Sequence, residues 1–328
     1  MKIWFFWTGD FSKNILKDIL ENNEIEVLVA VSQQDKPVWR KQELLPTEVK
    51  TLCLEKNIPI LQPEKLKNNT EIFEYLKNLD LDFIVVVAYW KIIPKAILEI
   101  PKFWCINIHG SILPKYRWAS PIQESIKMWD TETWLTIMYM SEWMDEWDIL
   151  EIEKVNIDIL DNSLDIFKKF EKLWTNLLIK TLNKVVSWEI ISKKQIEEDS
   201  TYCSKIDKKD GQINWKEESA KQIYDKFRAY TPWPWIYSYY NDKKISFEDC
   251  FYYEIDLSED EELIPWDVIE IENEHYDEKN PASKNKEIWV VCKKWIFIIK
   301  QVKLEWKKTM DINIFINWYK EFINYTFN

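Results

Sequence analysis

The sequence predicts a doubly wound α/β domain with a mostly parallel sheet, followed by a small β-barrel-like domain. Up to residue 190, short apolar runs alternate with amphipathic stretches, which is the pattern of strands joined by helices. The segment DFIVVVAY at 82–89 is a continuous β-branched run, as expected for a strand buried on both faces of a parallel sheet. Beyond residue 210, short strand-like runs and turns replace this alternation.

The elements of the first domain follow from hydrophobic periodicity. Strands are expected at residues 2–7, 27–33, 82–89, 103–109, 134–140 and 148–157. Helices are expected at residues 11–22, 94–100, 120–129 and 163–185.

The second domain is expected to open with a helix and to continue mainly as strands. The helix is expected at 219–230, and a last helix at 311–322. Strands are expected between them at residues 236–240, 243–249, 267–271, 287–293 and 295–305. The polar segment 191–210 is weakly periodic and is interpreted as a linker, so the expected domains are 1–190 and 211–328.

Composition limits the class of protein. With 44 basic and 56 acidic residues the net charge is −12, and no apolar run is long enough to span a membrane. The apolar start is too short for a signal peptide and is interpreted as a first strand. Five scattered cysteines and only two histidines argue against a zinc site, so we expect reduced thiols, no metal and a cytoplasmic location.

Asn107 and His109 are the first candidates for chemistry. They lie two apart at the end of a predicted central strand, so their side chains share one face. Ligands of open α/β sheets bind outside the carboxyl ends of the strands, and Gly110 and Ser111 turn the chain there. An amide beside an imidazole can polarise a carbonyl and stabilise an oxyanion, whereas a lone histidine is more often structural.

Asp145 is the carboxylate that could orient His109, although Glu146 and Asp148 are close alternatives. The other histidine, His275, is surrounded by charged residues and is interpreted as a solvated loop residue. The first β–α turn contains no GxGxxG motif, and the chain contains no P-loop, GxSxG or HExxH motif.

The segment 88–150 resembles the core of the methionyl-tRNA formyltransferase family. That core contains an Asn-x-His, a Ser-Leu-Leu-Pro loop, an Arg-Gly-Ala-Ala-Pro turn and a later aspartate. Here these stand as Asn107 and His109, Ser111–Pro114, the turn 117–121 and Asp145. Further similarity at 31–66, 213–215, 231–235 and 300–310 extends the resemblance over nearly the whole chain.

The resemblance implies formyl transfer from 10-formyltetrahydrofolate to methionyl initiator tRNA in translation initiation, with an OB-like second domain that binds tRNA. It implies catalysis by Asn107, His109 and Asp145 without a metal, and we expect a monomer. The residues implied to line the folate site are Ser111, Ile112, Leu113, Pro114, Ala88, Tyr89 and Trp90. The residues expected to contact tRNA are Arg40, Lys41, Lys115 and Arg117.

Two other functions stay open on the sequence. One is a formyltransferase of the same fold that acts on a small amine, such as an amino-sugar nucleotide. The other is an inactive module that only binds tRNA, against which the intact Asn107, His109 and Asp145 argue. The acidic net charge counts mildly against a tRNA partner, because nucleic-acid-binding proteins usually carry a basic surface.

The glycine content is abnormal. The chain has 3 glycines and 20 tryptophans, whereas average usage of about 7% predicts roughly 23 glycines. Tryptophan stands where the resembling family usually has glycine; we call these positions the suspect tryptophans. They are Trp7, Trp39, Trp90, Trp104, Trp118, Trp129, Trp134, Trp143, Trp147, Trp235, Trp266, Trp295, Trp306 and Trp318. Trp215 and Trp233, by contrast, match tryptophans of the family, which favours a genetic code in which UGA encodes glycine.

Mass spectrometry of the native protein tests this interpretation directly. Peptides that cover residues 111–128 should contain glycine in place of Trp118, because glycine is favoured where a loop requires positive φ or a close backbone approach. Peptides that cover Trp215 and Trp233 should retain tryptophan and serve as the internal control. A native peptide with tryptophan at position 118 would refute the recoding.

Overall fold

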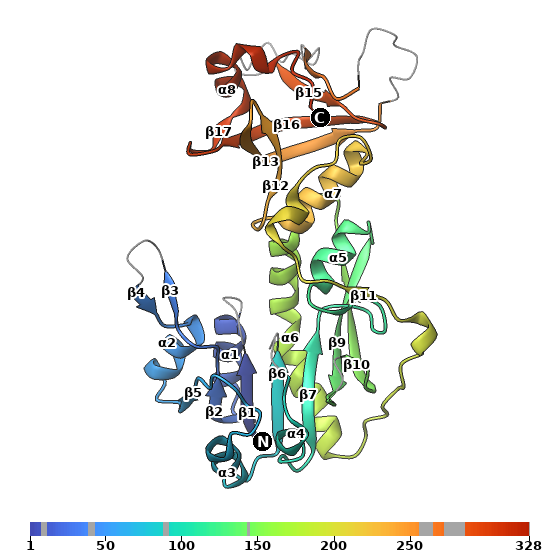
Figure 1. The fold of residues 1–328 in the computed structure, drawn as a ribbon. Helices are drawn as coiled ribbons and strands as arrows, with labels where there is room; N and C mark the ends of the chain where they lie inside the picture. Colours follow the sequence, from blue (N-terminus) through green and yellow to red (C-terminus); the bar gives the residue numbers. More distant parts are fainter. Residues whose placement is uncertain are drawn as a thin grey trace. The chain divides into compact units, whose positions relative to one another are not determined.

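The structure is a computed structural model that describes residues 1–7, 12–38, 43–87, 92–142, 145–255, 265–271 and 286–327 (Figure 1). The chain forms two compact units. Unit 1 contains residues 1–125, 131–157 and 165–205, and unit 2 contains residues 126–130, 158–164 and 206–328.

Unit 1 is built on a seven-stranded sheet in the order β10-β9-β7-β6-β1-β2-β5. The five parallel strands are β1 (Lys2–Trp7), β2 (Glu26–Val31), β5 (Ile60–Leu61), β6 (Phe83–Val87) and β7 (Trp104–His109). The antiparallel strands are β9 (Glu132–Tyr139) and β10 (Ile149–Asn156). The predicted doubly wound, mostly parallel sheet is therefore confirmed.

The centre of the sheet is fixed by burial on both faces. All five residues of β6 are buried, as its continuous β-branched sequence predicts. On one face the core includes Trp4 and Phe6 of β1 together with Ile84 and Val86 of β6. Because β7 pairs in register with β6, this core also fixes where the end of β7 lies.

Helices connect the strands of unit 1. They are α1 (Ser12–Leu20), α2 (Glu48–Glu55), α3 (Thr70–Lys77), α4 (Lys95–Leu98), α5 (Pro121–Lys127) and α6 (Ser163–Val186). Thr47 and Asn69 cap α2 and α3 through side-chain oxygens, as such residues do at helix starts. The short pieces are β3 (Lys36–Val38), β4 (Glu43–Leu45), β8 (Arg117–Trp118), η1 (Glu197–Asp199) and β11 (Tyr202–Cys203).

Unit 2 is a six-stranded antiparallel sheet with two helices. The strands are β12 (Ile236–Tyr240), β13 (Lys243–Tyr253), β14 (Val268–Ile271), β15 (Glu287–Val291), β16 (Ile296–Leu304) and β17 (Met310–Asp311). The helical segments are η2 (Lys208–Gly211), α7 (Ala220–Tyr230), α8 (Ile312–Trp318) and η4 (Lys320–Phe322). The predicted strand-rich domain is confirmed as an antiparallel sheet in the order β12-β13-β16-β15-β14, with β17 paired to β16.

Trp215 forms the centre of the core of unit 2. Its ring is fully buried and stacks on Phe327 with centroids 4.7 Å apart. Its Nε1 donates a hydrogen bond of 2.9 Å to Ser238 Oγ, so the only polar group of the indole is satisfied. This tryptophan, which matches a tryptophan of the resembling family, therefore fits its site.

Many other tryptophans have a backbone conformation that disfavours a side chain. Sixteen described non-glycine residues have positive φ, and eight of them are tryptophans. Seven are suspect tryptophans, namely Trp104, Trp118, Trp129, Trp235, Trp266, Trp295 and Trp306, and the eighth is Trp188. Trp215 and Trp233 are not among them. Bulky residues are uncommon at positive φ, so these backbones favour glycine, and the recoding stays a prediction supported by conformation.

Comparing Gly and Ala variants at one position isolates the effect of Cβ. Trp306 has φ 64° and is 89% exposed, so replacing its indole removes little packing. We expect the free energy of unfolding of Trp306→Gly to exceed that of Trp306→Ala by about 1 kcal/mol, because a left-handed backbone conformation is unfavourable for a residue with a Cβ. Urea unfolding measures the difference.

Trp318 provides the matched control, because it is similarly exposed but belongs to helix α8. There the order should reverse, with Ala more stable than Gly, because a helical backbone favours alanine. If Ala were the more stable residue at both positions, the conformational argument would fail.

Candidate active site

Strand β7 positions Asn107 and His109. Because they lie two apart on one strand, both side chains leave the same face of the sheet. Their register is fixed by β9, where Met138 and Thr136 lie opposite them. Gly110 follows directly, and a Cβ there would lie 3.1 Å from Ile122 Cγ1, so a side chain at this position would require Ile122 to shift.

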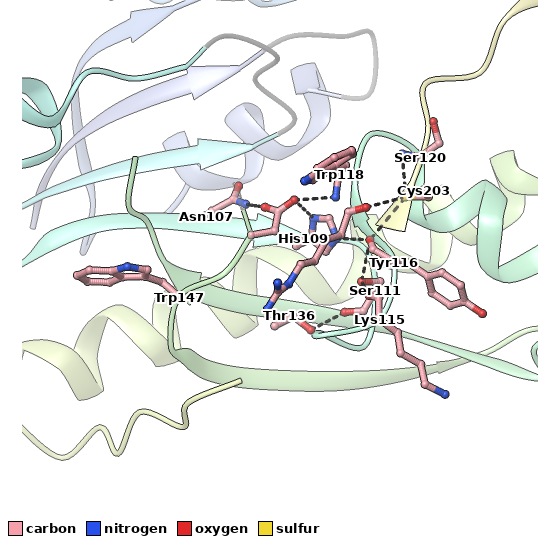
Figure 2. A network of polar contacts seen from close by, with 12 residues as sticks. Asn107, His109, Ser111, Lys115, Tyr116, Trp118, Ser120, Thr136, Trp147 and Cys203 are labelled. Atoms are coloured by element: carbon pink, nitrogen blue, oxygen red, sulfur yellow. Dashed lines mark hydrogen bonds and ion pairs between the residues drawn. The ribbon is translucent and has the colours of Figure 1, made fainter. Parts of the chain in front are cut away.

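The carboxylate of Asp145 contacts both Asn107 and His109. Its Oδ1 accepts a hydrogen bond of 3.2 Å from Asn107 Nδ2, and its Oδ2 accepts one of 2.9 Å from the peptide nitrogen of Trp118. The same Oδ2 lies 3.7 Å from His109 Nδ1. Figure 2 shows the side chains of Asn107 and His109 and the backbone of Trp118 converging in this network.

The hydrogen-bond partner of His109 indicates its tautomer. Nε2 lies 2.9 Å from the carbonyl oxygen of Tyr116, which can only accept, so Nε2 carries a hydrogen. Nδ1 is therefore the nitrogen directed at Asp145. The imidazole is held on both sides, because the strand sets its position and the Tyr116 carbonyl and the carboxylate set its orientation.

The loop after β7 uses its own polar groups to keep its shape. Ser111 is fully buried, and its Oγ donates to the carbonyl of Lys115 at 2.6 Å, while Thr136 Oγ1 donates to the carbonyl of Ser111 at 2.5 Å. Leu113 is buried, Ile112 and Pro114 are half-buried, and Lys115 is exposed.

Arg117, which the sequence suggested for tRNA contact, is completely buried. Its guanidinium donates to both carboxylate oxygens of Glu197 at 3.0 Å, to Tyr202 Oη at 3.1 Å and to Gln195 Oε1. Because these partners occupy the guanidinium, Arg117 is not available to bind a phosphate. The prediction for this residue is corrected to a role within the protein.

Several predicted site residues lie outside the described residues. These are Ala88, Tyr89 and Trp90, predicted for the folate site, and Arg40 and Lys41, predicted for tRNA. The pairing of Val87 with Ile108 places the end of β6 next to the end of β7.

The segment that the sequence suggested as a linker contributes contacts that sequence reasoning missed. Gln195 Nε2 donates to the carbonyls of Asp145 and Trp147, at 2.9 and 2.7 Å. Strand β11 pairs in parallel with β8, and Cys203 Sγ donates to the carbonyl of Arg117 at 3.1 Å. A polar, weakly periodic segment carries no signal that could have identified these partners.

The indoles near the site lie against other aromatic rings. Trp118 has φ 80° and is 48% exposed, and its ring lies 4.8 Å from that of Tyr202. The ring of Trp147 lies 5.9 Å from that of Trp104. The indole of Trp118 is therefore half exposed to solvent and lies against the ring of Tyr202.

The cysteines are not thiolate nucleophiles. All five are buried and free, and burial raises the pKa of Cys53 and of Cys203 to about 11. Burial also raises the pKa of Cys105, Cys250 and Cys292. Because the thiolate is the effective sulfur nucleophile, burial disfavours nucleophilic attack by any of the five cysteines.

The described ranges contain neither a metal-binding cluster nor a helix that could cross a membrane. No described group of His, Cys, Asp and Glu side chains is arranged to hold a metal ion. Within the same ranges, no helix has the length and apolar character that a membrane crossing requires.

Comparison with known proteins agrees with this architecture. The Formyl transferase family profile matches residues 1–182, and the profile of its C-terminal domain matches residues 205–320. A methionyl-tRNA formyltransferase of Caldicellulosiruptor saccharolyticus is 39% identical over 321 residues, which cover 98% of this chain and 97% of that protein.

Two solved structures show a similar fold. WlaRD, a sugar 3N-formyl transferase solved in the presence of dTDP and 5-N-formyl-THF, has a TM-score of 0.61 and 19% identity, and covers 94% of this chain and 99% of its own. Methionyl-tRNA formyltransferase from Clostridium thermocellum has a TM-score of 0.54 and 20% identity, and covers 76% of this chain and 93% of its own.

The Glu197–Arg117 pair predicts a pH dependence of stability. Hydrogen bonding from Arg117 is the main reason why the pKa of Glu197 is lowered. A carboxylate with a lowered folded-state pKa stabilises the fold above its unfolded pKa, about 4.3, and that stability is lost as pH falls through the folded value. We expect Glu197→Gln to weaken the acid-induced loss of unfolding free energy, measured by urea unfolding between neutral pH and pH 3.

Glu198→Gln is the matched control, since Glu198 is also exposed and lies next in the chain. Its free energy of unfolding should fall between neutral pH and pH 3 as steeply as that of the unsubstituted protein. An identical slope for Glu197→Gln would contradict the proposed coupling to Arg117.

Proposed function

The chain belongs to the methionyl-tRNA formyltransferase family, and we propose that it transfers the formyl group of 10-formyltetrahydrofolate to the α-amine of methionine on initiator tRNA. The observation that carries this proposal is the convergence of Asn107 and His109 on the carboxylate of Asp145 at the end of β7. The enzyme would act in the cytoplasm as a monomer during translation initiation.

The reaction requires a donor for the oxygen on which charge develops. The amine nitrogen bonds to the formyl carbon, the bond from that carbon to N10 breaks, the amine loses a proton and N10 gains one. Asn107 has two amide hydrogens and gives one to Asp145, so the second is the donor we assign to the formyl oxygen. A preorganised donor stabilises such an oxyanion without reorganisation during the reaction.

His109 and Asp145 would manage the proton. The carboxylate faces Nδ1 at 3.7 Å and stabilises positive charge on the ring as a proton arrives. The Tyr116 carbonyl holds Nε2 and keeps the ring from turning. In this scheme the imidazole assists transfer of the amine proton, and Asp145 also orients the amide of Asn107.

The folate donor is proposed to lie beside the loop 111–114. Ile112 and Pro114 are partly accessible there, and the segment after β6, with Ala88, Tyr89 and Trp90, follows a strand that neighbours β7. Ser111 supports this loop through the carbonyl of Lys115. A sugar 3N-formyl transferase of similar fold was solved in the presence of 5-N-formyl-THF, which supports a folate donor for this chain.

The tRNA surface is proposed to include Arg40, Lys41 and Lys115 and the domain 211–328. Lys115 is exposed and follows the proposed folate loop directly. Arg117 is left out because its guanidinium is already occupied by Glu197, Gln195 and Tyr202.

The direct test is formylation of charged initiator tRNA by the full chain with glycine at the suspect tryptophans. An amino-sugar nucleotide serves as the competing acceptor, because WlaRD is a sugar formyl transferase of similar fold. If the protein formylated the amino-sugar nucleotide and left Met-tRNA unformylated, the amino-sugar nucleotide would replace Met-tRNA as the proposed acceptor.

The catalytic trio has a quantitative prediction. We expect Asn107→Ala, His109→Ala and Asp145→Asn each to lower kcat by about a hundred- to a thousandfold, because each removes a preorganised electrostatic group. Asparagine is chosen at 145 because Asp145 has φ 61°, a conformation that asparagine tolerates and alanine does not. Steady-state formylation kinetics measure the loss, with KM values much less affected.

Glu146→Gln is the control, since Glu146 is an exposed carboxylate next to Asp145. It should keep near-normal turnover. If Glu146→Gln lost as much activity as Asp145→Asn, the loss would not be specific to the carboxylate of Asp145.

The tRNA contact has its own prediction. Neutralising Arg40 and Lys41 together should raise the KM for tRNA and flatten its dependence on salt, since each phosphate contact releases counterions. The KM for the folate donor should stay the same. An unchanged salt slope would place the tRNA surface elsewhere on the chain.

A further inference from the structure

Gln195 is a saturated hydrogen-bonding junction. Its Nε2 donates to the carbonyls of Asp145 and Trp147 at 2.9 and 2.7 Å, and its Oε1 accepts from Nε and Nη2 of Arg117 at 3.2 and 3.0 Å. An amide has two donor hydrogens and two acceptor lone pairs, so the side chain uses its whole capacity. It joins three segments that are distant in sequence.

Arg117 is the fixed base of this junction. Its five N–H groups are matched by five hydrogen bonds, to Gln195, to both oxygens of Glu197 and to Tyr202. Its backbone is held as well, because Arg117 N donates to the carbonyl of Thr201 at 2.9 Å. A fully buried and fully satisfied guanidinium has little freedom to move.

Asp145 is therefore tied to Arg117 at both ends. Its carboxylate accepts from the peptide nitrogen of Trp118, the residue after Arg117, and its carbonyl accepts from Gln195, which Arg117 holds. The segment that carries Gln195 is itself anchored, since the backbones of Lys193 and Ile149 exchange two hydrogen bonds of 2.8 Å. These contacts restrict both the position and the orientation of Asp145.

We propose that Gln195 is a positioning residue that sets the location of Asp145 relative to Asn107 and His109. The proposal rests on the proposed function, in which Asp145 orients both side chains. It uses only backbone atoms of Trp118 and Trp147, so it holds whether those positions carry tryptophan or glycine. Because Asp145 has a left-handed backbone in a loop, it needs outside contacts to stay in place.

Two substitutions of Gln195 separate acceptance from Arg117 from donation to the carbonyls of Asp145 and Trp147. Gln195→Met keeps the length of the side chain and removes all four hydrogen bonds. Gln195→Glu still accepts from Arg117 but directs a carboxylate at two carbonyl oxygens. If the carbonyl of Asp145 is what Gln195 holds, both variants should lower kcat roughly tenfold to a hundredfold, with KM values for both substrates nearly unchanged. Gln195→Glu should also be at least as stable as Gln195→Met.

A double-mutant cycle tests whether Gln195 acts through Asp145. In an Asp145→Asn background, adding Gln195→Met should change kcat by less than about twofold, because residues that act as a unit are not additive. Ile196→Ala is the control, since Ile196 is 60% exposed in the same segment, and its kcat should match that of the unsubstituted enzyme. The proposal would be overturned if Gln195→Met kept wild-type turnover. It would also be overturned if Gln195→Met lowered kcat by the same factor in the Asp145→Asn background as in the unsubstituted enzyme.

A readout without substrate separates this inference from the proposed function. The chain has only two histidines, so the imidazole ¹⁵N resonances of His109 can be assigned with His275→Gln. Gln195→Met should shift them toward the values found in Asp145→Asn, and Ile196→Ala should not. Unchanged His109 resonances in Gln195→Met would overturn positioning, whereas failure of the unsubstituted enzyme to formylate Met-tRNA would overturn only the function.

Discussion

The hydrogen bond from the peptide nitrogen of Trp118 to the carboxylate of Asp145 is the contact on which the rest of the site depends. Asn107 and His109 are placed by a strand whose register is fixed by a buried core, so the positions of their backbones do not depend on Asp145. Asp145 lies in a loop with φ 61° and has no strand to hold it. Its carboxylate can serve both side chains only because other segments hold it at 2.9 Å from a backbone donor.

These contacts orient the side chains of the site more than they stabilise the fold. A hydrogen bond to a charged group contributes about 1.5–3 kcal/mol, and exposed ion pairs contribute less. Glu197 is largely exposed, so water screens its pair with Arg117, yet the pair orients a buried guanidinium. The same guanidinium orients Gln195, which in turn holds the carbonyl of Asp145.

The tryptophans show that backbone conformation carries information separate from side-chain identity. Gly211 has no room for a Cβ, which would lie 2.1 Å from the carbonyl oxygen of Trp235, and Trp235 itself has φ 64°. Trp215, with its satisfied indole nitrogen and stacked ring, fits its site fully. The contrast between Trp215 and the positive-φ tryptophans agrees with the glycine pattern of the family, because the fold demands glycine geometry where the sequence has indoles.

The sequence by itself determined most of the longer strands and helices, the doubly wound sheet and the pair Asn107 and His109, because periodicity and strand alternation are local properties. It did not predict β5, α2 or α3. Local pattern alone could not choose Asp145 over Glu146 and Asp148, since that choice depends on which carboxylate reaches β7; only the family resemblance pointed to Asp145. Only the tertiary structure decided that Arg117 is buried and that Gln195 contacts the site. Those contacts join residues nearly eighty positions apart, and no local pattern encodes such a pairing.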